Sequence, residues 1–90
     1  MSITFYACRG PNGGYCEDPS GPLPLAEGQA ACGYAWELGD VLTIEGDPLG
    51  PVLCNDRGAL SERQIDRFFW EEADGWAWLG LVGTIGIVRR

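Results

Sequence analysis

The sequence contains no histidine and few basic residues, and these two shortages limit the metal sites and the partners that it can have. Without histidine, the only zinc site available to the chain would use its four cysteine thiolates. Six basic residues against thirteen acidic ones give a formal charge of −7. Because a phosphate backbone is held by Lys and Arg, we expect no nucleic-acid partner, and nothing in the composition indicates a cofactor.

Long apolar runs are also missing. The apolar stretches near both ends are short and interrupted by glycine, so the sequence predicts no membrane span. The opening MSITFYAC lacks the charged start and apolar centre of a secretory signal, and we expect any export to use another route. Ninety residues predict one domain, 1–90, which buries roughly 60 to 65 per cent of its unfolded surface.

The four cysteines are Cys8, Cys16, Cys32 and Cys54, and no two of them form a CxxC pair. An even number in a short chain favours two disulfides, which would place the protein outside a reducing cytoplasm. Three pairings are open, and we predict Cys8 with Cys16 and Cys32 with Cys54. A four-thiolate zinc site and four free buried thiols are the alternatives.

Fourteen glycines, six prolines and short runs of Val, Ile, Leu, Phe and Trp favour short strands over a helical bundle. A loop rich in Gly and Pro covers 9–29 and is expected to pack through Tyr15, Leu23 and Leu25. Trp76 and Trp78 cannot share a helix face, so one of them should be exposed. The predicted strands are 3–8, 30–36, 40–45, 51–55, 64–69 and 81–89, with a helix over 71–79.

Six short strands with one small helix before the last predict an all-β chain closed into a compact barrel, because a flat sheet would leave aggregation-prone edges. Asp56 and Asp66 lie ten residues apart, each at or near a strand end, with a polar loop between them. Two carboxylates on strands joined by such a loop can share one cleft and carry out acid–base chemistry. Both could instead tie the loop by accepting backbone N–H bonds.

Several stretches resemble a known family: VLTIEG after Leu38 and Gly39, NDRG at 55–58, IDRFFW at 65–70, and WLG at 78–80 before a Val/Ile-rich end. Over 31–88 the chain resembles the double-psi β-barrel of the three-aspartate (3D) domain of lytic transglycosylases, such as membrane-bound lytic transglycosylase A, and of cell-wall proteins related to resuscitation factors. It is also similar to rare lipoprotein A and, more distantly, to the first domain of expansins. The family's first aspartate and the histidine of rare lipoprotein A have no counterpart here.

The resemblance implies a peptidoglycan lytic transglycosylase in which Asp66 is the single general acid and base. Burial beside Ile65, Phe68 and Phe69 and the charge of Asp56 should raise the Asp66 pKa, whereas Arg57 or Arg67 would lower it. Asp56 would stay ionised and stabilise positive charge on the sugar ring. The residues predicted to contact the sugar are Arg57, Tyr34, Trp36 and Trp70. The three aromatic residues could instead be part of the core.

Three function classes remain open. The first is the lytic transglycosylase acting on peptidoglycan glycan strands, and the second is a non-catalytic, expansin-like wall-binding module. The third is a small structural barrel of a phage tail tip or secretion assembly, with other subunits as its partners. All three place the chain outside the cytoplasm, at the cell wall or in a virion.

Overall fold

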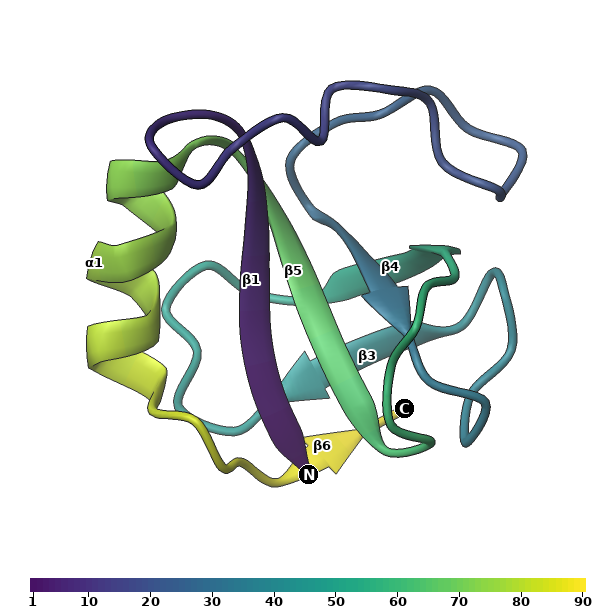
Figure 1. Cartoon of the computed structure of the whole chain (residues 1–90). Helices are drawn as coiled ribbons and strands as arrows, with labels where there is room; N and C mark the ends of the chain where they lie inside the picture. The colour runs from purple at the N-terminus through teal and green to yellow at the C-terminus, as the bar shows by residue number, and fades with distance from the viewer.

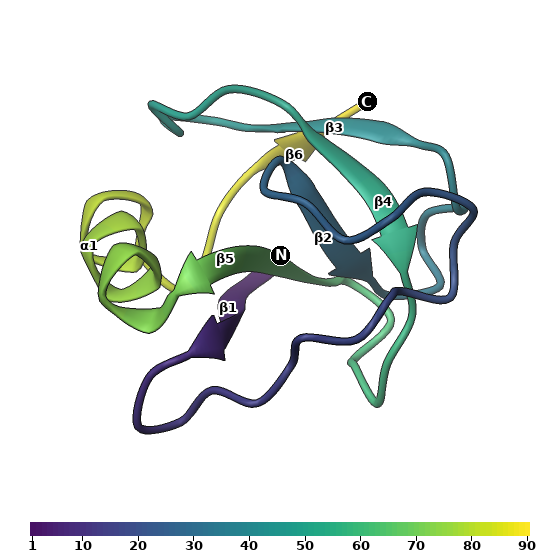
Figure 2. The ribbon, with the colours of Figure 1, turned by 90° about the horizontal axis from the view of Figure 1, so that it is seen from above.

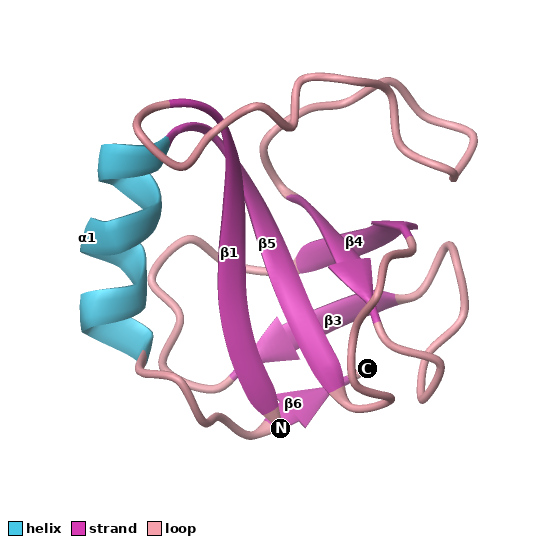
Figure 3. Cartoon of the chain, viewed as in Figure 1, coloured by secondary structure: helices cyan, strands magenta, loops and turns pink.

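The computed structural model describes all of residues 1–90 as a mostly β chain with one helix (Figures 1 and 3). Along the chain the elements are β1 Ser2–Arg9, β2 Gln29–Cys32, β3 Val41–Ile44, β4 Val52–Asp56, β5 Gln64–Glu71, α1 Glu72–Val82 and β6 Val88–Arg89. The expected all-β character with one helix before the last strand is therefore confirmed.

The six strands form one sheet in the order β1-β5-β2-β4-β3-β6, curled into a half-barrel (Figure 2). The pairs β1–β5 and β2–β4 are parallel, whereas β2–β5, β3–β4 and β3–β6 are antiparallel. A single bridge between Ser2 and Ile85 links β1 to the segment before β6. Strands distant in sequence thus lie side by side, and β1 and β5 run together at the front of Figure 1.

The main core lies inside the curl of the sheet. In β3 the buried Leu42 and Ile44 alternate with exposed Val41 and Thr43, as strand periodicity predicts. The core also holds Ile3, Ala30, Cys32, Trp36, Val52, Cys54, Ile65, Phe69 and Trp78. A smaller cluster of Cys8, Leu25 and Phe68 lies apart from it, with Tyr6 and Trp70 packed against it.

Helix α1 lies beside β1, and its place is set by a close contact at Gly75 (Figure 1). A Cβ at this position would lie within van der Waals overlap of the Phe5 ring, so only glycine allows this approach. The helix ends where Gly83 adopts a φ of 81° and donates its N–H to the carbonyl of Leu79. Trp76 is 57 % exposed and Trp78 is buried, which confirms that one of the two faces outward.

Both predicted disulfides are present, Cys8–Cys16 and Cys32–Cys54. All four sulfurs are therefore oxidised, and the zinc and free-thiol alternatives are wrong. Cys8–Cys16 closes the start of the long loop, and Cys32–Cys54 joins the neighbouring strands β2 and β4 in the core. Two disulfides indicate an oxidising compartment.

Three expected boundaries are wrong. The strand predicted over 30–36 ends at Cys32, because the chain turns at Gly33, whose carbonyl accepts the N–H of Trp36. The helix predicted over 71–79 begins at Glu72 and continues to Val82, so most of the strand predicted over 81–89 is helix or irregular, and only Val88–Arg89 is strand.

The long loop packs less than expected. Of its three predicted anchors, only Leu25 is buried, whereas Tyr15 is 60 % and Leu23 is 47 % exposed. Among the polar contacts that hold the loop, the side-chain amide of Asn55 donates to the carbonyl of Leu23 and accepts its N–H. The one helix of the chain is too short and too polar to cross a bilayer.

Candidate functional site

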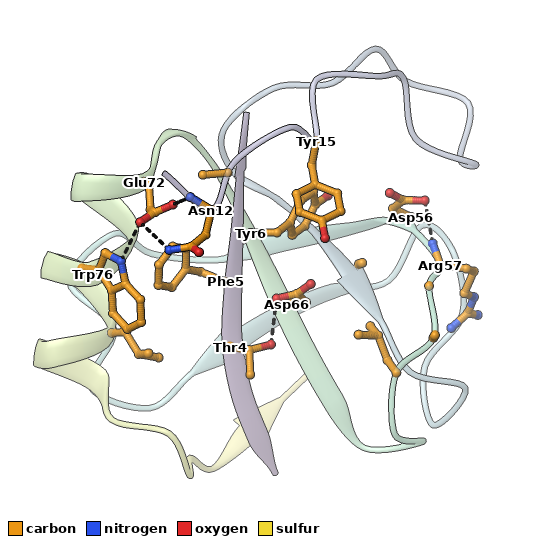
Figure 4. A pocket seen from close by; sticks show the side chains of 16 residues that line it. Thr4, Phe5, Tyr6, Asn12, Tyr15, Asp56, Arg57, Asp66, Glu72 and Trp76 are labelled. Carbon is orange, nitrogen blue, oxygen red and sulfur yellow. Dashed lines mark hydrogen bonds between the residues drawn. The ribbon is translucent and has the colours of Figure 1, made fainter. Parts of the chain in front are cut away.

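A cavity of about 690 Å³ lies over the outer face of β1 and β5, between helix α1 and the loop after β4 (Figure 4). Polar and charged side chains gather in it from segments that are far apart in the sequence. It is lined by Thr4, Phe5, Tyr6, Ala7, Asn12, Tyr15, Ala31, Asp56, Arg57, Gly58, Ala59, Leu60, Asp66, Glu72, Trp76 and Leu79. The predicted pair Asp56 and Asp66 therefore opens onto one cavity, together with Arg57.

The two aspartates share a row that crosses four strands. Thr4 of β1 is paired with Asp66 of β5, Asp66 with Ala31 of β2, and Ala31 with Asp56 of β4. All four residues line the cavity, so their side chains project to the same side. Two strand spacings put the Asp66 and Asp56 Cα atoms about 10 Å apart. Ala31 is the residue between them in the row.

A β-bulge brings Asp56 into this row. Ala30 pairs with Cys54 but the next residue, Ala31, pairs with Asp56, so Asn55 is the extra residue of β4. Asn55 turns into the interior, where its side chain binds Leu23 and the side-chain oxygen of Gln29. Without the bulge, Asn55 would take the position opposite Ala31, and Asp56 would project from the other face.

Asp66 is the partly buried acid of the site. Burial raises its pKa, the charge of Asp56 adds to this, and a hydrogen bond from the Thr4 hydroxyl to Oδ1 at 2.7 Å works in the opposite direction. Gln64 donates from Nε2 to Thr4 Oγ1 at 3.0 Å, which directs the threonine proton toward Asp66. The expected direction of the Asp66 pKa is thus found, with burial and the charge of Asp56 as its causes, but of the three apolar neighbours expected to bury it, Ile65 and Phe69 face the opposite side of the sheet.

Asp56 also ties the chain together. Its Oδ1 accepts the N–H and the hydroxyl of Ser20 at 3.0 and 2.8 Å, and the N–H of Arg57 at 2.8 Å. The structural role considered for the aspartates is therefore observed for Asp56, whereas Asp66 accepts no backbone N–H. All three bonds end on one oxygen, so Oδ2 of Asp56 takes no part in them.

Arg57 lines the cavity, but its guanidinium is occupied elsewhere. Nη1 donates to the carbonyls of Cys32 and Gly33, and Nη2 donates to the carbonyl of Trp36, at 2.7 to 2.9 Å. The guanidinium carbon lies 4.5 Å from the ring centroid of Tyr34. Tyr34 is 75 % exposed and lies next to the cavity through this contact, outside its wall.

The other two aromatic residues expected to contact a sugar do not reach the cavity. Trp36 is buried in the main core, as its alternative position predicted. Trp70 follows Phe68 on the same face of β5 and packs edge-on against it at 4.9 Å between ring centroids. The contact role predicted for Trp36 and Trp70 therefore has no geometric basis at this cavity.

Arg67, expected as a possible partner of the aspartates, lies on the opposite face of β5. Its Nη1 donates to Oδ2 of Asp47 at 2.8 Å, and both side chains are almost fully buried. Trp78 Nε1 donates to the other Asp47 oxygen at 2.9 Å. Burial lowers the pKa of Arg67 while Asp47 raises it, and neither arginine contributes to the pKa of Asp66.

The sequence did not point to several cavity residues, namely Thr4, Tyr6, Asn12, Glu72 and Trp76. Glu72 accepts the N–H of Asn12 at 2.6 Å and the Trp76 Nε1–H at 3.1 Å, and these bonds lower its pKa. Thr4 and Tyr6 lie in the first predicted strand, 3–8, which β1 confirms. The strand that pairs with it was not visible in the sequence.

No group of three or more Cys, Asp and Glu side chains is arranged to hold a metal ion. No family model matches the chain, and neither a curated protein nor a solved structure matches it. The site must therefore be interpreted from its own geometry.

Proposed function

We propose that the chain is a glycan-cleaving domain of the lytic transglycosylase type, with Asp66 as the general acid and base. The observation that carries this proposal is the row Asp66–Ala31–Asp56, which directs two carboxyl groups into one cavity. The carboxyls of paired glycosidases lie roughly 5 to 9.5 Å apart, a separation that side chains from these two positions can adopt.

In this reaction the protonated Asp66 donates its proton to the glycosidic oxygen as the bond to the anomeric carbon breaks. The resulting carboxylate then accepts the proton of the sugar's own 6-hydroxyl, whose oxygen attacks the anomeric carbon, so an anhydro sugar forms without water. Burial of Asp66 raises its pKa, which favours the protonated form needed for the first step. The Asp56 carboxylate, on the far side of Ala31, stabilises positive charge on the ring.

We also propose that the half-barrel is a double-psi β-barrel of the three-aspartate type. The order of the NDRG and IDRFFW stretches along the chain and their convergence at one cavity support this. The family's first aspartate is absent, and Thr4 and Tyr6 occupy the neighbouring polar positions on β1. The substrate in this proposal is the peptidoglycan strand, reached outside the cytoplasm.

A second candidate is a wall-binding module without cleavage. Asp56 favours it, because three donors already occupy its Oδ1 and give it a structural role. The cavity also carries the aromatic rings of Tyr6, Tyr15 and Trp76, which can stack on sugar rings without any acid–base step.

The two candidates separate in one experiment. Purified chain is incubated with peptidoglycan sacculi, and the soluble fraction is analysed by mass spectrometry for anhydro-muropeptides. We expect release by the wild type and by Asp74→Asn, which makes the same change on the exposed start of α1, and no release by Asp66→Asn. Binding to sacculi without release would support the second candidate. The absence of both binding and release would overturn both.

A further inference from the structure

The hydroxyl of Tyr6 is buried and has no protein partner. Tyr6 projects from β1 beside Phe68, with 5.3 Å between the ring centroids, and its oxygen makes no hydrogen bond. Buried polar groups are nearly always paired, and leaving one unpaired costs about 1 to 3 kcal/mol. Burial, Asp56 and Asp66 all raise the pKa of Tyr6, so the group remains a neutral O–H donor that lacks an acceptor.

None of the nearby carboxylate oxygens accepts a hydrogen bond from the Tyr6 hydroxyl. Asp56 and Asp66 both act on Tyr6 through their charge and line the same cavity (Figure 4). Oδ1 of Asp66 is bound to Thr4, and Oδ1 of Asp56 is bound to Ser20 and the Arg57 N–H. This part of the cavity therefore offers one unused O–H donor together with Oδ2 of the Asp56 carboxylate, which can only accept.

Tyr15 of the long loop packs against the Tyr6 ring. Its ring lies edge-on to Tyr6, with centroids 5.9 Å apart, and it stands in front of Tyr6 in Figure 4. The Tyr15 side chain is 60 % exposed and makes no hydrogen bond, and it follows Gly14, whose φ is 109°. Rotation of the side chain loses little more than one aromatic edge contact, worth about 0.5 to 1.5 kcal/mol.

We propose that rotation of Tyr15 uncovers the Tyr6 hydroxyl and that this hydroxyl binds the carbonyl oxygen of a sugar acetamido group, which makes the cavity selective for N-acetylated sugars. An acetamido group is neutral and supplies the matching set: a carbonyl acceptor for Tyr6, an N–H donor for the neighbouring carboxylate and a methyl group for apolar wall residues such as Ala31 and Leu60. An anionic group would be repelled by the Asp56 carboxylate, and an ammonium group has no lone pair that can accept the Tyr6 O–H. The inference deepens the proposed function and rests on it for the glycan substrate.

The test compares three tetrasaccharides with the same β-1,4 linkage by titration calorimetry: tetra-N-acetylchitotetraose, its deacetylated form and cellotetraose. We expect the wild type to prefer the acetylated form, and Tyr6→Phe to weaken that binding roughly tenfold, the size of one lost hydrogen bond, with no change for cellotetraose. Tyr34→Phe removes an exposed hydroxyl outside the cavity wall and should bind as the wild type does. Equal affinity of the wild type and Tyr6→Phe for the acetylated form would overturn the inference.

The free energy of unfolding of Tyr6→Phe without ligand gives a second readout. Removing an unpaired buried hydroxyl should leave stability unchanged or raise it, whereas a clear loss would mean that the hydroxyl has a partner in the free protein and would overturn the inference. The proposed function fails separately. Acetamido preference without anhydro-sugar release would leave the binding inference standing and remove catalysis. Release that is insensitive to Tyr6→Phe, with unchanged affinity, would do the reverse.

Discussion

Thr4 and Asp66 are paired across β1 and β5, and the Thr4 hydroxyl donates to Oδ1 of Asp66 at 2.7 Å. This bond favours the ionised carboxylate and limits the rise in pKa that burial causes. Thr4→Val keeps the side-chain shape but removes the donor, so the Asp66 pKa should rise further. The measurement is an NMR titration of the carboxyl carbon. Thr4→Ser keeps the hydroxyl and should titrate close to the wild type, and a lower pKa in Thr4→Val would contradict the assignment.

The raised pKa of Asp66 also predicts how stability depends on pH. A carboxyl with a higher pKa in the folded than in the unfolded state binds protons more tightly when folded. The contribution of Asp66 to the free energy of unfolding is fully present below the ordinary Asp pKa of about 3.9. It is lost as the pH rises through the pKa of Asp66 in the folded state. Asp66→Asn does not titrate, so its free energy of unfolding should exceed that of the wild type at neutral pH, with a smaller difference in acid. Urea unfolding across this pH range is the check, and a difference independent of pH would be the contrary result.

Local patterns in the sequence predicted the elements better than their partners. The alternation over 41–45 and the NDRG and IDRFFW stretches located β3, β4 and β5, because strand periodicity is a local property. The parallel pairing of β1 with β5 joins residues about sixty positions apart, and no local pattern specifies it. The strand that carries Thr4 and Tyr6 was therefore predicted, while its place beside Asp66 was not.

Two errors have specific physical causes. The final strand was predicted from Val and Ile content, but the helix continues to Val82, and of the residues after it only Val88–Arg89 are strand. Trp36 was expected in the cleft because it lay in the second predicted strand, 30–36, but the chain turns at Gly33 and Trp36 lies in the core. At Gly33 a Cβ would overlap the carbonyls of Ser61 and Glu62, so the turn depends on a tertiary contact that the sequence alone does not reveal.

We expect the Arg57 guanidinium to stabilise the fold rather than to contact substrate. It binds three backbone carbonyls at the turn after β2, and a charged hydrogen bond of this kind contributes about 1.5 to 3 kcal/mol. We expect Arg57→Ala to lower the free energy of unfolding by about 2 to 3 kcal/mol in chemical denaturation. Arg63 lies on the same loop, exposed and without a side-chain bond, so Arg63→Ala should stay within about 0.5 kcal/mol of the wild type. Equal effects of the two substitutions would rule out this role.

The buried pair Arg67–Asp47 should be costly to break and less costly to replace. Asp47 bonds both Arg67 and the Trp78 indole, and it is closed off from solvent. Removing one member leaves an uncompensated buried charge, so Asp47→Ala should lower the free energy of unfolding by about 3 to 5 kcal/mol. Arg67→Met combined with Asp47→Leu removes both charges, and it should lose less than the sum of the single changes in a double-mutant cycle. The exposed pair Arg9–Glu71 provides the comparison, since Arg9→Ala should cost at most about 1 kcal/mol. Additive effects of the two buried changes would show that Arg67 and Asp47 do not depend on each other.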